Sequence, residues 1–219
     1  MSVDNRKDTD CRICTIVASK PAKAVDQILA ENDNYFAVSS VGGFIPGWTL
    51  IFPKTHILNL SNDYSRSEFL SFAANVANVV SEEYGSCVAF EHGSNSYNSA
   101  TSCGVHHAHM HLVPFSENIE LLALQESEDL LWKPAQLDEI RSLANGGEYL
   151  FCSNSFEGLA TKGIFAKLNS PKSQFFRKVL ARATGFLTMY DYKQYKFNEV
   201  SEDTTQKLLK KFAMAAVAE

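Results

Sequence analysis

The feature that most constrains the fold is an alternation of histidine and apolar residues from His107 to Pro114, which reads HAHMHLVP. In a β-strand, side chains two positions apart point to the same face, about 6.6–6.8 Å apart along the backbone. A strand over Val105–Pro114 therefore places His107, His109 and His111 in one row and turns the intervening apolar residues towards a core. A helix would scatter the three imidazoles around its circumference.

Three kinds of chemistry fit such a row of histidines: a metal site, a nucleophilic or acid–base site, or the two side by side. The chain has six histidines, and five of them lie between positions 92 and 111. Imidazoles that share one face are costly to bury unless they are used, because polar groups removed from water need partners. We therefore expect the functional site in this region, and we expect His106 to have a structural role. His92 lies where we expect a loop to begin, and two roles stay open for it: a loop residue away from the site, or one whose side chain reaches the site.

The segments that precede this strand complete an α+β unit. Short apolar runs predict strands, and apolar positions close to a 3.6-residue period predict a helix over 67–84 that Gly85 ends. Residues 93–104 are rich in Ser, Asn and Gly and are predicted to form a loop. The predicted strands are Tyr35–Ser39, Trp48–Pro53, Cys87–Glu91 and Val105–Pro114. Together they indicate an antiparallel sheet with one main helix over residues 1–115.

The remaining residues, 116–219, are expected to form a second α+β region. After a charged helical stretch over 121–131, strands are predicted at Tyr149–Ser153 and Gly163–Leu168, followed by a helix over 173–184. This order repeats the strand–strand–helix order of the first half. Two explanations stay open: a degenerate half-repeat of the first unit, or the general frequency of that order. The second half contains no histidine, so the predicted chemistry belongs to the first.

Charge and composition restrict the partners and the location. Twenty Lys and Arg residues against 25 Asp and Glu residues give a net charge of −5 over 219 residues, which argues against general nucleic-acid binding. No segment approaches the roughly 18 consecutive apolar residues of a membrane span. The first ten residues, MSVDNRKDTD, lack the apolar core of a signal peptide. We therefore expect a cytoplasmic protein without a membrane partner.

Cysteine spacing adds a separate signal. The chain has five cysteines, and Cys11 and Cys14 form a Cys-x-x-Cys pair. In a chain without an export signal this spacing suggests metal or redox chemistry rather than a disulfide framework, and inert thiols are the remaining alternative. Cys87 and Cys152 lie in apolar strands and are expected to be core residues.

These motifs, in this order, resemble the histidine triad (HIT) superfamily of nucleotide hydrolases and nucleotidyl transferases. The resemblance is carried by Cys11-x-x-Cys14, by GWTLIFPKTH ending at His56, and by His107-φ-His109-φ-His111-φ-φ. It is closest to the zinc-containing type, here with an additional C-terminal region. The resemblance implies a HIT-like catalytic domain over 1–115, followed by a C-terminal α+β extension over 116–219.

The resemblance also implies roles for the triad. His109 would attack the α-phosphorus of a nucleotide-like substrate and form a covalent intermediate, which water or a second acceptor resolves. His111 would hydrogen-bond the phosphoryl or leaving oxygens. Backbone amides of the loop Cys103, Gly104 and Val105 would cradle the phosphate, where glycine permits close approach.

A structural zinc site follows from the same resemblance. Its ligands would be Cys11, Cys14, His56 and His107. Two thiolates and two imidazoles form a closed tetrahedral shell that suits Zn²⁺ and leaves no open position for catalysis. The Zn²⁺ would then tie the N-terminal segment to the sheet beside the nucleophile.

The chain departs from the family at positions that contact substrate. Trp48 stands where many members have a histidine, and Ser40 aligns with an aspartate that binds ribose hydroxyls in many members. Cys103 and Gly104 stand where Gln and Ser or Thr are common. Trp48 offers a stacking surface for a base, or else core packing. We include Trp48 and Ser40 among the expected substrate-binding residues.

Other functions and assemblies remain open at this point. A non-catalytic nucleotide- or partner-binding module with the HIT fold is the main alternative to an enzyme. Catalytic zinc on the three triad histidines is disfavoured, because the resemblance assigns His107 to the closed site with Cys11, Cys14 and His56. The chain is expected to be a homodimer or a monomer paired internally through its two halves.

Overall fold

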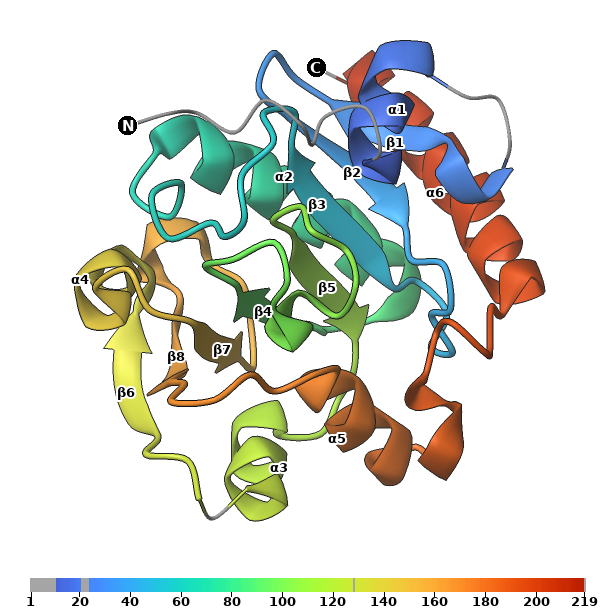
Figure 1. Ribbon diagram of the computed structural model, residues 1–219. Helices are drawn as coiled ribbons and strands as arrows, with labels where there is room; N and C mark the ends of the chain where they lie inside the picture. Colours follow the sequence, from blue (N-terminus) through green and yellow to red (C-terminus); the bar gives the residue numbers. More distant parts are fainter. Residues whose placement is uncertain (1–10, 21–23, 128, 219) are drawn as a thin grey trace.

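The structure is a computed structural model that describes residues 11–20, 24–127 and 129–218. It is an α+β fold in which helices cover both faces of one eight-stranded sheet (Figure 1). The strands are β1 Ile28–Glu31, β2 Tyr35–Ser39, β3 Thr49–Pro53, β4 Cys87–Gly93, β5 Met110–Pro114, β6 Lys133–Gln136, β7 Tyr149–Ser153 and β8 Lys162–Lys167. The helices are α1 Arg12–Ser19, α2 Ser67–Tyr84, α3 Ile119–Glu126, α4 Ile140–Ala144, α5 Phe175–Ala183 and α6 Asn198–Ala218. Single 3-10 turns lie at Ala24–Asp26, Ala100–Ser102, Leu137–Glu139, Gly158–Ala160 and Leu187–Tyr190.

The sheet runs across both halves of the sequence. Its strand order is β1-β2-β3-β5-β4-β7-β8-β6, and all neighbouring strands are antiparallel. The first five strands in this order come from residues before 115 and the last three from residues after it. The two groups meet where β4 pairs with β7, with Phe90 opposite Cys152. The expected α+β class with an antiparallel sheet is confirmed.

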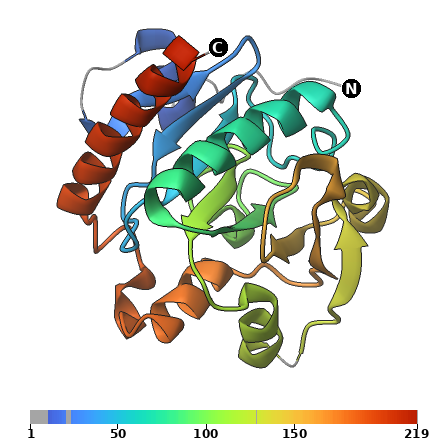
Figure 2. The ribbon, with the colours of Figure 1, turned by 180° about the vertical axis from the view of Figure 1, so that it is seen from behind.

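Each face of the sheet has its own core, as the side-chain alternation of a strand requires. On one face, the apolar side of α2 packs against alternate residues such as Ala89 of β4 and Met110 of β5. On the other face, α3 and α5 pack against Val88 and Phe90 of β4. On that same face, α1 covers β2 and β3. Figure 2 shows α2 in front of the sheet, on the side opposite to α1 and α5.

The strand predicted over Val105–Pro114 begins only at Met110, so that part of the prediction is wrong. The register places Met110 opposite Ile51, and the backbone N–H of Ala108 donates to Ile57, in the loop after β3, instead of to β3. β3 ends at Pro53, which has no N–H to donate. The predicted alternation nevertheless persists, because Ala108, Met110 and Leu112 all lie in the core under α2.

The strand predicted over Cys87–Glu91 is two residues longer than expected. His92 pairs with Leu150 and Gly93 with Tyr149, so β7 extends β4 to Gly93. His92 is therefore a buried strand residue and does not begin a loop. The pairing partner lies about sixty positions along the chain, which local sequence patterns do not reveal.

The two halves share the order of their elements but not their arrangement. β2–β3 and β7–β8 are both antiparallel pairs followed by a helix. However, α2 and α5 lie on opposite faces of the sheet. The second neighbour of β2 is the edge strand β1, whereas that of β7 is β4 in the middle of the sheet. The structure thus repeats a local order without repeating the packing around it.

The expected division at residues 115 and 116 falls within this continuous sheet. The pairing of β4 with β7 is internal to one chain, as the internally paired alternative requires. Whether 1–115 and 116–219 unfold as separate units, and whether two chains associate, stay predictions.

The longest helix, α6, closes one end of the sheet beside β1 and β2 (Figure 1). Its hydroxyl side chains bond the loop after β2: Ser201 donates to the carbonyl of Ser40 at 2.6 Å, and Thr204 accepts the N–H of Gly47 at 3.0 Å. Among the described helices, α6 included, none is both long enough and apolar enough to cross a membrane.

A buried carboxyl lies under α2, on the sheet face opposite to α5. Glu91 of β4 is fully buried and accepts hydrogen bonds from the hydroxyls of Tyr64 and Tyr149 and from the N–H of Leu60. Burial raises the pKa of Glu91 to about 7, although these hydrogen bonds act in the opposite direction.

This shift makes stability depend on pH. A carboxyl with a raised pKa in the folded state holds its proton more tightly there than in the unfolded chain, so its contribution is complete below about pH 4.5 and is lost as the pH rises through 7. Relative to a Glu91→Gln variant, the wild type should lose about 3 kcal/mol of unfolding free energy between pH 4.5 and 8. Urea unfolding of both proteins across this range measures the difference. Parallel pH profiles would contradict the assignment.

Candidate active site

A small cavity lies on the sheet face between α1 and α5, over the part of the sheet where β5 lies between β3 and β4. Its volume is about 50 Å³. Its lining includes three histidines and two arginines from four segments of the chain: His92, His109, His111, Arg12 and Arg177. Ser40 and Cys103, both expected to bind substrate, also line this cavity. The structure therefore brings the two expected catalytic histidines together with residues from both halves of the chain.

The hydrogen bonding of His109 leaves one ring nitrogen available. Its Nδ1 lies 2.8 Å from the carbonyl oxygen of His107. A carbonyl can only accept, so Nδ1 carries the proton and Nε2 keeps its lone pair. The ring stacks on Phe52, with ring centroids 5.2 Å apart, and burial lowers the pKa of His109. A neutral imidazole with a free Nε2 is the form in which histidine acts as a nucleophile.

His111 is held in the complementary tautomer. The indole N–H of Trp48 donates to Nδ1 of His111 at 3.0 Å, and an indole nitrogen cannot accept. Burial holds the pKa of His111 well below its usual value, so the neutral ring carries its proton on Nε2. The ring stacks on Phe90 at 4.3 Å and lies 4.7 Å from the ring of His109. His111 is thus a fixed hydrogen-bond donor beside a free nucleophile.

Trp48 is buried, and its indole N–H is used in the hydrogen bond to His111. Its side chain is 1% exposed and belongs to the core beneath α5. In this position it offers no accessible face on which a base could stack. Ser40 is also buried, and its carbonyl is occupied by Ser201.

The loop that should cradle a phosphate has most of its amides in use. The N–H of Cys103 bonds to Ala100 and the N–H of Val105 bonds to Ser102, which closes a tight turn. Cys103 and Gly104 have left-handed backbone conformations, with φ of 58° and 84°. A Cβ atom on Gly104 would lie 2.9 Å from Nζ of Lys193, the far end of a flexible side chain that can shift, so it is the left-handed φ that favours glycine here. Of the three amides, only that of Gly104 has no partner within the described chain.

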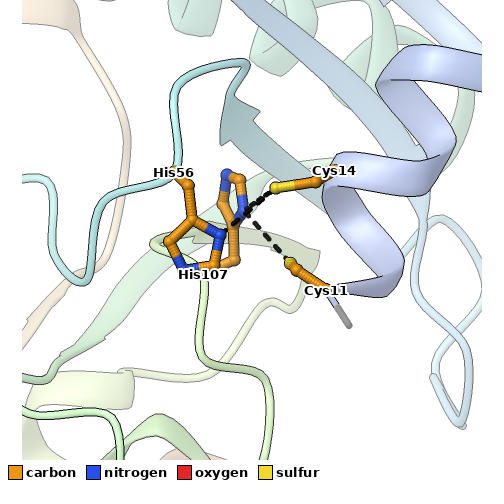
Figure 3. Close-up of side chains that lie close together, drawn as sticks. All are labelled: Cys11, Cys14, His56 and His107. Carbon is orange, nitrogen blue, oxygen red and sulfur yellow. Dashed lines mark hydrogen bonds between the residues drawn. The ribbon is translucent and has the colours of Figure 1, made fainter. Parts of the chain in front are cut away.

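The four expected metal ligands lie together at the other end of the histidine row (Figure 3). Cys11 and Cys14 come from the start of α1, His56 from the loop after β3, and His107 from the segment before β5. Their ligand atoms all lie within 4.8 Å of one another. Nε2 of His107 donates to the carbonyl of Pro53 at 2.8 Å, which turns its Nδ1 towards the two sulfur atoms. This cluster could hold a metal ion.

A larger pocket of about 710 Å³ opens beside the small cavity. The two share five lining residues: Arg12, Ile13, Val41, Val105 and Tyr192. The larger pocket is also lined by His106, whose Nδ1 lies 2.8 Å from the hydroxyl of Ser102. A small inner cavity at the histidines therefore adjoins an outer pocket large enough for a drug-sized molecule.

Comparison with known proteins identifies the first part of the chain. Residues 22–118 match the model of the HIT domain family. These residues are a HIT domain. No curated protein matches the chain.

Three solved structures resemble parts of the chain. A HIT family hydrolase from Clostridium thermocellum is 24% identical, covering 53% of this chain and 95% of its own, with a TM-score of 0.36. A HIT-like protein of Bartonella henselae described as involved in cell-cycle regulation is 24% identical, covering 42% and 70%, with a TM-score of 0.33. A hypothetical histidine triad nucleotide-binding protein of Sulfolobus tokodaii is 18% identical, covering 49% and 70%, with a TM-score of 0.36.

Important residues of the site lie outside the HIT domain. Cys11 and Cys14 precede it, while Arg177 and Tyr192 follow it. The sequence motifs did not predict the last two as site residues. A signal was present, because Arg177 occupies a position on the buried side of α5 that the helical pattern would give to an apolar residue. For His92, reaching the site was one of the two alternatives left open, but its position on a strand was missed because β4 is longer than predicted.

The tautomer of His111 can be tested directly. Replacing Trp48 with Phe removes the indole N–H that donates to Nδ1 of His111, at a cost of about 1 kcal/mol in hydrogen bonding. We expect ¹⁵N spectra of the imidazoles to change from a pure Nε2–H form of His111 to a mixture of tautomers. The matched control is Trp132→Phe, since that indole packs on Phe175. An unchanged His111 spectrum in the Trp48→Phe variant would refute the assignment.

Proposed function

We propose that the protein is a phosphohydrolase or nucleotidyl transferase of the HIT type that works through a covalent intermediate on His109. The observation that carries this proposal is the hydrogen bond from His109 Nδ1 to the carbonyl of His107, which leaves Nε2 as a free nucleophile in the cavity. The proposed substrates are nucleoside phosphate derivatives, with the remainder of the molecule in the outer pocket.

The reaction proceeds in two displacements. Nε2 of His109 attacks the α-phosphorus, a nitrogen–phosphorus bond forms, and the bond to the leaving group breaks with its electron pair on the leaving atom. His111 donates a hydrogen bond from Nε2 to the oxygens on which negative charge develops. Water or another acceptor then attacks phosphorus, loses a proton to solvent, and returns the lone pair to Nε2. The carbonyl of His107 stabilises the positive ring during the intermediate.

The nucleophile proposal predicts the behaviour of a His109→Ala variant. Turnover of a panel of nucleotide conjugates should fall at least about a thousandfold, because the covalent route is lost. Acid-quenched wild-type protein should show a mass increase corresponding to the nucleotidyl group, and the variant should show none. Thermal melting serves as the control for folding.

Two results would contradict this mechanism. One is most of the activity surviving in His109→Ala. The other is wild-type protein that binds nucleotides without turnover or adduct, which would favour a non-catalytic binding module with the same fold.

We also propose that Cys11, Cys14, His56 and His107 hold a structural Zn²⁺. Tetrahedral zinc with ordinary bond lengths separates sulfur and nitrogen ligands by about 3.5 Å. The corresponding distances are 3.2 Å from Cys14 to His56, 3.5 Å from Cys11 to His107 and 3.7 Å from Cys14 to His107. The ring nitrogen of His107 that faces away from the cluster is held by a backbone carbonyl, a usual partner of metal-bound histidine. Zinc here would contribute folding energy and no reactive water.

The metal proposal predicts close to one zinc per chain by elemental analysis. Cys14→Ser should lose the metal and lower the melting temperature by roughly 10 °C, because binding energy contributes directly to folding. The matched control is Cys87→Ser, which alters a buried thiol outside the cluster and should keep the zinc. Protein prepared without chelators that holds no metal yet melts like the zinc-loaded form would refute the site. A cytoplasmic location is part of the same proposal, since it keeps these thiols reduced.

A further inference from the structure

We propose that Arg177, from the chain beyond the HIT domain, binds the oxygens of the reacting phosphoryl group together with the ring N–H of His92. This inference rests on the proposed function and adds a binding device for the phosphate, half of it supplied by the C-terminal extension. The chemical class recognised is a tetrahedral phosphoryl oxyanion at the inner end of the substrate pocket.

Arg177 is a buried cation without a matching anion. Its side chain is 3% exposed, and among the described residues no carboxylate forms an ion pair with it. It donates from Nε to the carbonyl of Tyr190 at 2.8 Å and from one terminal nitrogen to the carbonyl of Gly42. Its guanidinium lies 4.7 Å from the ring of Trp48, the residue that orients His111. Burying a charge in this way is costly unless an anion enters the cavity it lines.

Asp191, an acidic residue that acts on Arg177 through space, has its hydrogen bonds to other groups. Asp191 accepts hydrogen bonds from the side chain of Gln174 at 3.2 Å and from the N–H of Lys193 at 3.0 Å. It influences Arg177 only through space. The guanidinium is therefore held by two carbonyls and by aromatic faces, which orient it without cancelling its charge.

His92, which lines the same cavity, carries a buried ring nitrogen without a hydrogen-bond partner among the described residues. Its Nε2 accepts the N–H of Phe176, at the start of α5, at 3.3 Å, so the neutral ring carries its proton on Nδ1. His92 is 6% exposed, and its Nδ1 has no hydrogen-bond partner in the described part of the chain. Nδ1 lies on the ring edge turned away from the α5 amide. A buried N–H without an acceptor is unfavourable, and a phosphoryl oxygen in the cavity would satisfy it.

The rest of the cavity wall explains why such donors are needed. Two of the three amides expected to cradle the phosphate are occupied by the turn at Cys103. Arg177 and His92 line the cavity together with His109 and His111. A phosphoryl group at Nε2 of His109 would thus meet a cation and two neutral N–H donors, those of His92 and His111, without help from the occupied amides.

Binding of inorganic phosphate tests the inference without requiring a known substrate. Calorimetric titration of the full-length protein with phosphate should give saturable binding that weakens at least about tenfold in Arg177→Met, which keeps the side-chain volume but removes the charge. Arg177→Lys should recover part of the affinity, because lysine keeps the charge but not the fork of donors. The matched control is Lys178→Met, which removes the same charge from the neighbouring position on α5, outside the cavity.

Two further readouts separate binding from structure. The His92 Nδ1–H resonance should shift on phosphate addition to the wild type. With any substrate that is turned over, Arg177→Met should lower kcat/KM by about 100-fold, as loss of an oxyanion donor does elsewhere. If Arg177→Met melts well below the wild type, its phosphate binding is compared no further and the Arg177→Lys variant is used instead. Weaker phosphate binding by Arg177→Lys than by the wild type supports the inference, and an unchanged affinity overturns it.

The outcomes distinguish this inference from the proposed function. A wild type that fails to bind phosphate, or an Arg177→Met variant with normal phosphate affinity, would overturn the role of Arg177 even if His109 is the nucleophile. Conversely, an inactive wild type that binds phosphate through Arg177 would leave this inference standing while the proposed reaction fails.

Discussion

The pairing of β4 with β7 is the interaction on which the site depends. β4 carries His92 on one face and, through its pairing with β5, supports His111. β7 leads into β8 and then into α5, whose first turn donates a backbone N–H to His92. β4 of the HIT domain is therefore joined to the C-terminal extension in two ways. It pairs with β7 in the sheet, and its residue His92 accepts a hydrogen bond from the backbone of α5. This double attachment sets Arg177 at a fixed position over the histidines.

Burial then determines the chemistry of each imidazole. Desolvation lowers the pKa of His92 to about 3, lowers that of His109, and holds that of His111 well below its usual value, so all three are neutral at pH 7. In a neutral ring, one hydrogen bond decides which nitrogen carries the proton. Three different partners, a carbonyl, an amide and an indole, place the proton on Nδ1 of His109, on Nδ1 of His92 and on Nε2 of His111. The result is one nucleophile and two donors from the same residue type.

Sequence patterns were sufficient wherever the determining contacts are local. The helix over 67–84 and the strands at Tyr35–Ser39 and Tyr149–Ser153 have the predicted bounds, because each depends on its own periodicity. The clustering of the four expected metal ligands also appears as predicted. The predicted strand bounds were wrong where a distant segment determines the pairing. Pro53 and Ile57 delay the start of β5, and pairing with β7 lengthens β4.

The role of Arg177 could not be read from the sequence for a related reason. A positive residue in an amphipathic helix is ordinarily solvated, so the position of Arg177 on the apolar side of α5 marks it as unusual without showing which groups enclose it. Its environment arises from Trp48, Gly42 and Tyr190, which come from both halves of the chain. Only the continuous sheet brings these segments together.

His107 connects the metal cluster to the nucleophile through ordinary hydrogen bonds. Its Nδ1 faces the cysteines, its Nε2 donates to Pro53, and its carbonyl accepts the proton of His109 Nδ1. Rotation of the backbone at His107 would therefore disturb the ligand cluster and the nucleophile together. Cys11 and Arg12 add a second connection, since the start of α1 also forms part of the outer pocket wall. A structural metal at this cluster would thus act on substrate binding and on nucleophile orientation while remaining outside the chemical step.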